Sequence, residues 1–84
     1  MTIKVRFFAA LRESLGVDSL EISSAANTDL SGLLEHIRRT LGDAAVEALC
    51  APDIRVALNR EFVLGECVMT DGDEIAFMPP ITGG

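Results

Sequence analysis

One segment of this 84-residue sequence has a clear helical period, and it limits the folds open to the chain. From residue 29 to residue 41, apolar side chains recur every three or four positions and so share one side of an α-helix: Leu30, Leu33, Leu34, Ile37 and Leu41. Thr28 is the expected N-cap, and Gly42 is the expected stop. No second segment predicts a helix of this length, so this one must pack against a different kind of element.

The segments around the helix alternate between apolar and polar residues, as half-buried strands do. Residues 2–8 place Ile3, Val5 and Phe7 on one side, with Phe8 on the charged side. Residues 74–78 repeat the alternation, with Ile75 and Phe77 facing inward. Shorter strands are expected at 19–23, 54–58 and 62–64, turns at 59–61 and 71–72, and short helices at 9–15 and 43–50.

These elements predict an α+β fold of the ubiquitin-like β-grasp type. One long helix cannot cover both faces of a sheet, so we expect a mixed sheet of four to five strands with one main helix packed on one face. The first and last strands have the most apolar inner sides and should lie together at the centre. We expect a single β-grasp domain over residues 1–78 and a flexible tail over residues 79–84.

The uncovered face of this sheet should carry an apolar patch. Phe8 and Met78 are one residue out of phase with the inward-facing residues of their strands. Phe62 follows a turn and does not fit easily into the core with Val56 and Leu58. Large apolar groups gathered on an open face usually mark a protein-binding surface. The alternative is a shift in strand register that would bury Phe62.

The last six residues form a tail suited to reaching into another protein. Pro79 and Pro80 fix two φ angles and should direct the chain away from the sheet. Gly83 and Gly84 have no Cβ, so they can thread a channel too narrow for other residues. Six extended residues at about 3.3 Å each reach about 20 Å. We expect Gly84 to carry the free α-carboxylate; the alternative is a frayed end without a role.

Composition excludes several classes of function. The net charge is −6, and there is no Trp, no Tyr and no basic run, which argues against nucleic-acid binding and favours a partner with a basic face. No apolar run approaches the about 20 residues needed to span a bilayer, so we expect a cytosolic protein that binds no membrane. We expect no metal or bound cofactor: His36 should be a solvated surface residue, and Cys50 and Cys67, which lack metal-ligand spacing, should be free buried thiols.

Two stretches carry a resemblance to a known family: residues 4–13, KVRFFAALRE, and residues 70–84, TDGDEIAFMPPITGG. In these stretches the chain resembles the small subunits of molybdopterin synthase, which are sulfur carriers of the ubiquitin-like superfamily, and the match covers essentially the whole length. The family commonly has Phe-Phe-Pro-Pro where this chain has Phe77-Met78-Pro79-Pro80. Methionine keeps an apolar side chain but packs more adaptably, so this departure concerns the detail of an interface.

The resemblance implies that Gly84, next to Gly83, is the reactive end of a sulfur carrier. A ubiquitin-activating-type adenylyltransferase would consume ATP to adenylate the Gly84 carboxylate, and sulfur from a persulfide donor would displace AMP to leave a thiocarboxylate. The loaded tail would then enter the large synthase subunit and give its sulfur to cyclic pyranopterin monophosphate. The residues expected to contact partner proteins are Phe8, Phe62, Met78, Pro79, Pro80, Ile81 and Thr82.

On this interpretation the chain is the small, sulfur-donating subunit of a sulfurtransferase. The large subunit, expected in a heterotetramer with this chain, would supply the catalytic pocket, because this sequence offers no catalytic histidine or phosphate loop of its own. Two alternatives remain open. One is a Gly-Gly sulfur carrier for tRNA thiolation, cysteine or thiamine synthesis, since the fold does not encode the acceptor. The other is a non-catalytic ubiquitin-like interaction module.

Overall fold

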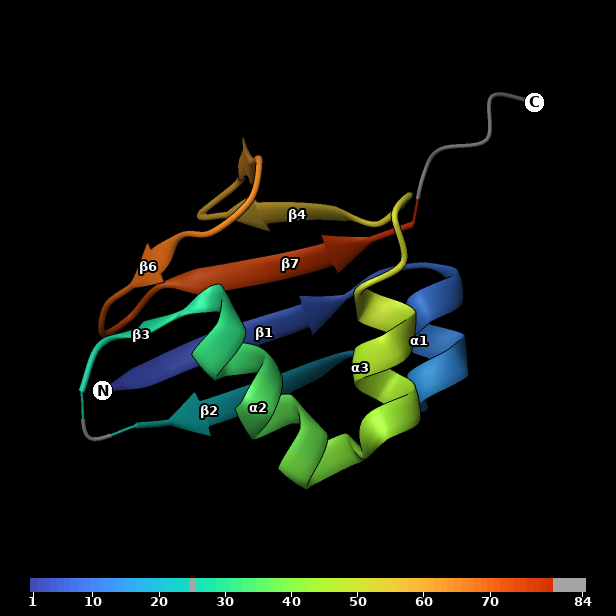
Figure 1. The fold of residues 1–84 in the computed structure, drawn as a ribbon, viewed down its shortest axis with the longest axis horizontal. Coiled ribbons are helices and arrows are strands. Elements are labelled where there is room, and N and C mark those ends of the chain that lie inside the picture. The colour runs from blue at the N-terminus through green and yellow to red at the C-terminus, as the bar shows by residue number, and fades with distance from the viewer. Residues whose placement is uncertain (25, 80–84) are drawn as a thin grey trace.

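The computed structural model describes residues 1–24 and 26–79, which form a sheet with helices packed against it (Figure 1). In these residues a main sheet of five strands is accompanied by a two-stranded pair, β3 with β6. The elements in chain order are β1 (Thr2–Phe7), α1 (Ala10–Leu15), β2 (Ser19–Ser23), β3 (Thr28–Asp29), α2 (Leu30–Leu41), α3 (Asp43–Leu49), β4 (Arg55–Leu58), β5 (Glu61–Val63), β6 (Val68–Met69) and β7 (Glu74–Met78).

The first and last strands lie side by side at the centre of the sheet, as predicted. The strand order is β2-β1-β7-β4-β5, with β1 and β7 parallel and the other neighbours antiparallel, so the sheet is mixed. The parallel register pairs Val5 with Ile75 and Phe7 with Phe77. The two phenylalanine rings stack with their centroids 6.1 Å apart, which adds a specific contact to the burial of both side chains.

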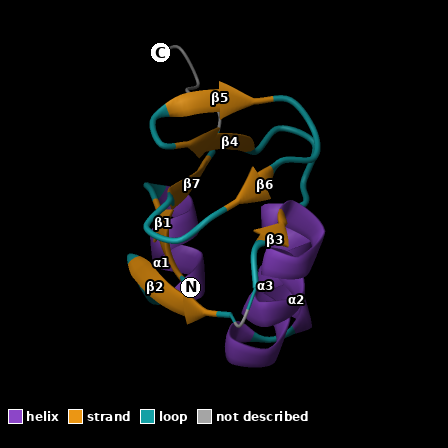
Figure 2. Ribbon diagram, turned by 90° about the vertical axis from the view of Figure 1, so that its left-hand side faces the viewer, coloured by secondary structure: helices purple, strands orange, loops and turns teal. Residues whose placement is uncertain are grey.

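All three helices share one core: α2 and α3 lie on one face of the sheet (Figure 2), and α1, which follows β1, contacts α3. Each contributes buried side chains to the cluster that contains Ile3, Val5 and Phe7: Leu11 from α1, Leu33 and Ile37 from α2, and Val46 and Leu49 from α3. The expected main helix on one face is therefore present, with α1 and α3 extending its cover. In the described part of the chain, no helix combines the length and apolarity needed to cross a membrane.

The start of α2 differs from the prediction that Thr28 is its N-cap. Asp29 is the N-cap, and its carboxylate accepts a hydrogen bond of 2.8 Å from the Gly32 N–H. Thr28 and Asp29 pair with β6, so the helix begins one residue later than a cap at Thr28 would place it. Gly42 ends the helix as predicted, with φ at 97° and its N–H donating to the Arg38 carbonyl at 2.8 Å.

A glutamate from the β5–β6 connection also holds the first turn of α2. The Glu66 carboxylate accepts hydrogen bonds from the Leu30 N–H at 2.6 Å, the Ser31 hydroxyl at 2.7 Å, and the Ser31 and Cys67 N–H groups at 3.3 Å each. The Ser31 hydroxyl, followed by the three backbone donors, lowers the pKa of Glu66 below its ordinary value of 4.5. Glu66 thus links the first turn of α2 to the connection between β5 and β6.

The expectation that both cysteines are buried is wrong. Cys50 is exposed because it follows the last residue of α3 and lies beyond the buried side of that helix. Cys67 is half-buried, and burial together with the negative charge of Glu66 raises the pKa of its thiol. Neither cysteine forms a disulfide, so both thiols are free as expected.

Candidate partner-docking site

The open face of the sheet brings together the three apolar residues predicted to form a patch. Phe8, Phe62 and Met78 line a single hollow of about 280 Å³. The Phe62 side chain is 70% exposed and Phe8 is 36% exposed. The alternative register that would bury Phe62 is therefore wrong: β5 pairs Phe62 with Ala57, on the face opposite the helices. We name the hollow and its lining residues the open-face hollow.

Two alanines form the floor of the open-face hollow. Successive strand pairings place Arg6, Ala76, Ala57 and Phe62 in one row across the sheet. Ala57 is only 4% exposed although it lies on the uncovered face, because larger side chains surround it. A pair of small residues between large ones leaves a depression, which the sequence alone does not reveal because it depends on the register of β4 against β7.

Phe8 is held at one wall of the hollow by a sharp turn of the chain. The Phe8 N–H donates to the Phe77 carbonyl at 3.2 Å, so the β1–β7 ladder continues one residue beyond β1. Ala9 then has φ at 53°, a costly conformation for a residue with a Cβ, and the chain turns into α1. The Arg6 guanidinium carbon lies 5.1 Å from the centre of the Phe8 ring, within reach of a cation–π contact.

The lining of the hollow also contains Arg60, whose backbone belongs to the β4–β5 turn. Asn59 and Arg60 both have positive φ, 50° and 73°, as a tight two-residue hairpin turn requires. The Asn59 amide donates to the Asp73 carboxylate at 3.0 Å and accepts from the Glu74 N–H at 2.9 Å. Hydrogen bonds from the Thr70 N–H and then from Asn59 lower the pKa of Asp73.

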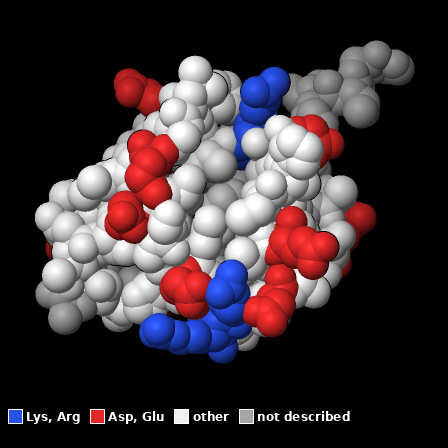
Figure 3. Space-filling view, in the orientation of Figure 1, with Lys and Arg blue, Asp and Glu red and all other residues white. Residues whose placement is uncertain are grey.

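Charge is divided unevenly between the two sides of the molecule. On the helix side, acidic side chains are spread widely and basic ones gather in a few places (Figure 3). On the open face, strand register and the lining of the hollow place four of the seven basic residues but only two of the thirteen acidic ones. These residues are Lys4, Arg6, Arg55 and Arg60, with Glu21 and Glu74. The open face is thus locally basic on an acidic protein.

The predicted tail follows directly on a residue that lines the open-face hollow. Met78 lines the hollow and is the last residue of β7, and Pro79, which follows it, is half-buried. The predicted site residues Pro80, Ile81, Thr82, Gly83 and Gly84 lie outside the described residues, and the tail boundary at residue 79 stays a prediction. Within residues 1–24 and 26–79, no group of three or more His, Cys, Asp or Glu side chains could hold a metal ion.

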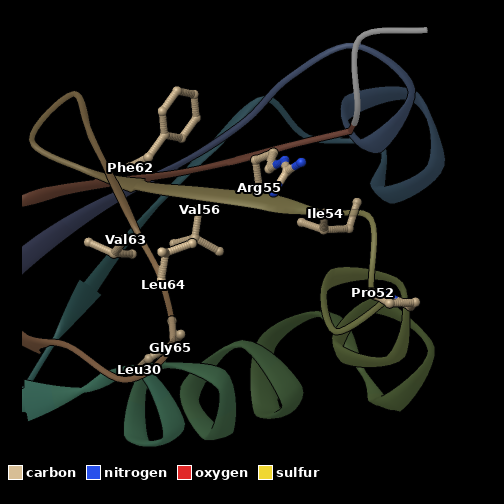
Figure 4. A pocket seen from close by; sticks show the side chains of 9 residues that line it. All are labelled: Leu30, Pro52, Ile54, Arg55, Val56, Phe62, Val63, Leu64 and Gly65. Atoms are coloured by element: carbon tan, nitrogen blue, oxygen red, sulfur yellow. The ribbon is translucent and has the colours of Figure 1, made fainter.

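A second hollow, of about 510 Å³, lies near the start of α2 (Figure 4). Its walls include Leu30, Val56 and Leu64, and Phe62 contributes to this hollow as well as to the open-face hollow. The Leu64 side chain is 95% exposed. The pattern of the sequence gave no sign of this hollow, because its walls come from segments that only the tertiary fold brings together.

The sheet order, the central parallel pair and the helices on one face define a ubiquitin-like β-grasp protein. The fold is similar to SAMP1 from Haloferax volcanii, with a TM-score of 0.81 and 22% identity over all of both chains. It is also similar to a chain in a complex of subunits 1 and 2 of the molybdopterin-converting factor from Helicobacter pylori, with a TM-score of 0.71 and 24% identity over all of both chains. At these identities, the likeness concerns the fold alone.

The sequence comparisons identify the family. The ThiS family model matches residues 5–84, and the chain belongs to the ThiS family. It is 39% identical over 82 residues to a molybdopterin synthase sulfur carrier subunit from Escherichia coli, covering 98% of this chain and 99% of the relative. A protein of the same description from Chlamydomonas reinhardtii is 35% identical over 88 residues, covering all of both chains. The resemblance to molybdopterin synthase small subunits is confirmed.

Proposed function

We propose that this chain is the sulfur carrier subunit of a molybdopterin synthase and that Gly84 carries the sulfur. The observation that supports this most strongly is the 39% identity to such a subunit over 98% of this chain and 99% of the relative. The open-face hollow supports it as well, because a docking surface that adjoins the tail can hold a partner while the tail enters that partner's active site.

The proposed chemistry requires activation because a carboxylate is a poor acceptor for a sulfur nucleophile. The Gly84 carboxylate attacks the α-phosphorus of ATP on an adenylyltransferase, and pyrophosphate leaves. The terminal sulfur of a persulfide then attacks the acyl carbon, and AMP leaves. A thiol cleaves the resulting acyl disulfide, so that the thiol is oxidised to a disulfide and Gly84 becomes a thiocarboxylate. ATP is consumed by the activating partner, and the carrier itself holds no cofactor.

In the last step the thiocarboxylate sulfur attacks a carbon of cyclic pyranopterin monophosphate on the large synthase subunit, and a carbon–oxygen bond at that carbon breaks, so that the oxygen leaves with the electron pair. Hydrolysis of the acyl–sulfur bond leaves the sulfur on the pterin and returns Gly84 as a carboxylate. The large subunit supplies the general acid and base groups, and two copies of each subunit form a heterotetramer. The Helicobacter pylori chain with this fold was solved in a complex of subunits 1 and 2, which is in keeping with such a partner.

Intact-mass measurement tests this function. The purified chain is incubated with ATP, the adenylyltransferase and a persulfide donor. We expect the oxygen-to-sulfur mass increase for the wild type and none for either of two tail variants. A chain lacking Gly84 ends in a carboxylate that stops one residue short of the activating site, and the Gly83→Phe side chain does not fit a channel that admits only glycine. Leu64→Phe adds a bulky group at a 95% exposed position and is the matched control, which should load like the wild type. Normal loading of both tail variants would contradict the proposal.

A second measurement separates this function from that of other Gly-Gly carriers. The wild-type chain is mixed with the large subunit of molybdopterin synthase and analysed by gel filtration. We expect a stable complex. A chain that becomes thiocarboxylated but forms no such complex serves another sulfur acceptor, and a chain that never becomes thiocarboxylated is an interaction module.

A further inference from the structure

We infer that the open-face hollow receives one bulky apolar side chain of the partner protein and that this side chain is surrounded by carboxylates. The inference rests on the proposed function and specifies the chemistry of the partner surface. The net charge of −6 alone would favour a partner with a basic docking face, whereas this inference predicts an acidic one.

The shape of the hollow supports a single inserted side chain. The Ala57–Ala76 floor is apolar, and Phe8, Phe62 and Met78 stand around it. Its volume of about 280 Å³ is just below the range of pockets that hold small molecules, about 300–1,000 Å³. An aromatic or aliphatic side chain seated in such a pocket is the usual centre of binding energy in a protein interface.

The arginines around the hollow set the charge of the partner. Arg6 and Arg60 line the hollow, and Arg55 is the register partner of Met78. All three are exposed, and none of them has a salt bridge within the described residues, where only Arg38 forms such pairs. Glu74 is the single acidic residue in the lining. Partner carboxylates can therefore pair with guanidinium groups whose charge is not already neutralised.

The Arg6 guanidinium is already positioned for binding, and the backbone that carries Arg60 is fixed. The Arg6 group lies against the Phe8 ring, and Arg60 belongs to a turn that Asn59 fixes to the start of β7. A side chain held in place before binding loses less conformational freedom on association. The two arginines stand on opposite sides of the alanine floor, so carboxylates that pair with both would flank the inserted side chain.

The local charge of the open face affects partner binding more than the net charge of the protein does, because electrostatic interactions weaken with distance. At physiological ionic strength the screening length is about 8 Å. The molecule measures 18 Å along its shortest axis, which runs from the helix side to the open face in the view of Figure 1. Acidic groups on the helix side are therefore largely screened from a protein docked on the open face, whereas Arg6 and Arg60 line the hollow in which it docks.

Charge reversals test the predicted sign. The affinity of the chain for the large synthase subunit is measured by calorimetry at about 0.1 M and about 1 M salt, where the screening length falls from about 10 Å to about 3 Å. We expect Arg6→Glu and Arg60→Glu to weaken binding about tenfold at low salt and less at high salt. Arg39→Glu, at an exposed position in the last turn of α2, makes the same change in net charge and should bind within about twofold of the wild type.

Filling the hollow tests the predicted shape. Ala76→Leu places a larger side chain on the floor without touching the core side of β7. We expect it to weaken binding by about tenfold or more at both salt concentrations, with the melting temperature of the free chain unchanged. The charge reversals need no change at the floor, so they test the proposal even if Ala76→Leu impairs folding.

The outcomes distinguish this inference from the function on which it rests. If the wild type forms no complex with the large subunit, the proposed function fails and the inference fails with it. If the wild type binds while the Arg6 and Arg60 reversals bind like Arg39→Glu, or more tightly, the acidic partner surface is wrong and the carrier function stands. If Ala76→Leu binds like the wild type, no partner side chain enters the hollow.

Discussion

The two sides of the central strands use similar residues for different purposes. Toward the helices, β1 and β7 present Phe7 and Phe77, which are almost completely buried and stacked on each other. Toward solvent, the same stretch of chain presents Phe8 and Met78, which line the open-face hollow. The helices cover one face only, so adjacent residues in the chain are separated into a set that stabilises the fold and a set that is free to bind.

The first prediction is that residues on the buried side of the sheet contribute far more to stability than residues on the open face. Equal contributions from the two sides would contradict the division of roles. Phe77→Ala should lower the free energy of unfolding by about 3–5 kcal/mol, because it removes a buried ring and leaves a cavity. Phe62→Ala removes a ring of the same size from a 70% exposed position. This substitution should change the free energy of unfolding by no more than about 0.5 kcal/mol. Urea unfolding followed by circular dichroism measures both, and similar losses would show that Phe62 belongs to the core.

The alternation of the sequence was sufficient to predict the faces of the central strands. In β1 and β7, every second residue is apolar, and a register slip would expose all of them, so the pattern fixes the side that packs on the helices. The period of α2 was equally informative because Leu33 and Ile37 both fall on its buried side. These predictions depend only on residues close together in the chain.

What the sequence did not predict depends on contacts between distant segments. Thr28 and Asp29 are both good capping residues, and the choice between them follows from their pairing with β6. The contacts of Glu66 with the first turn of α2 join residues 35 and 36 positions apart, and no local pattern marks them. The alanine floor requires the register of β4 against β7, so Phe8, Phe62 and Met78 were predicted to be exposed, but not the hollow between them.

The second prediction sharpens the comparison from the side of binding. Phe8→Ala and Met78→Asp should each weaken the complex with the large synthase subunit by about tenfold or more, because both residues wall the open-face hollow. The melting temperature of the free chain should change much less than it does for Phe77→Ala. Calorimetric titration and thermal unfolding of the same preparations give the two quantities.

Leu64→Ala is the matched control for this prediction, because Leu64 is a large exposed apolar residue that lines the second hollow and not the open-face hollow. We expect it to bind like the wild type. If Leu64→Ala weakens the complex and Phe8→Ala does not, the partner docks near the start of α2, and the division of roles between the two sides of the sheet is wrong.

The smallest expected effect concerns how the covered side is held together. Hydrogen bonds from Ser31 and nearby backbone groups lower the pKa of Glu66 in the folded chain below its ordinary value of 4.5. The ionised carboxylate therefore stabilises the fold above pH 4.5, and this contribution is lost as the pH falls through the lowered folded pKa. Glu66→Gln should be less stable than the wild type at pH 7, and the gap should narrow below pH 4.5.

Urea unfolding at pH 7, 5 and 3 measures this gap. Glu47→Gln, which removes one carboxylate from an exposed position of α3, controls for the change in net charge. A gap between wild type and Glu66→Gln that stayed constant from pH 7 to pH 3 would show that ionised Glu66 does not secure the first turn of α2. Because Glu66 lies outside the open-face hollow, Glu66→Gln should also leave the affinity for the large subunit unchanged, and a loss of affinity would mean that the packing of α2 shapes the open face as well.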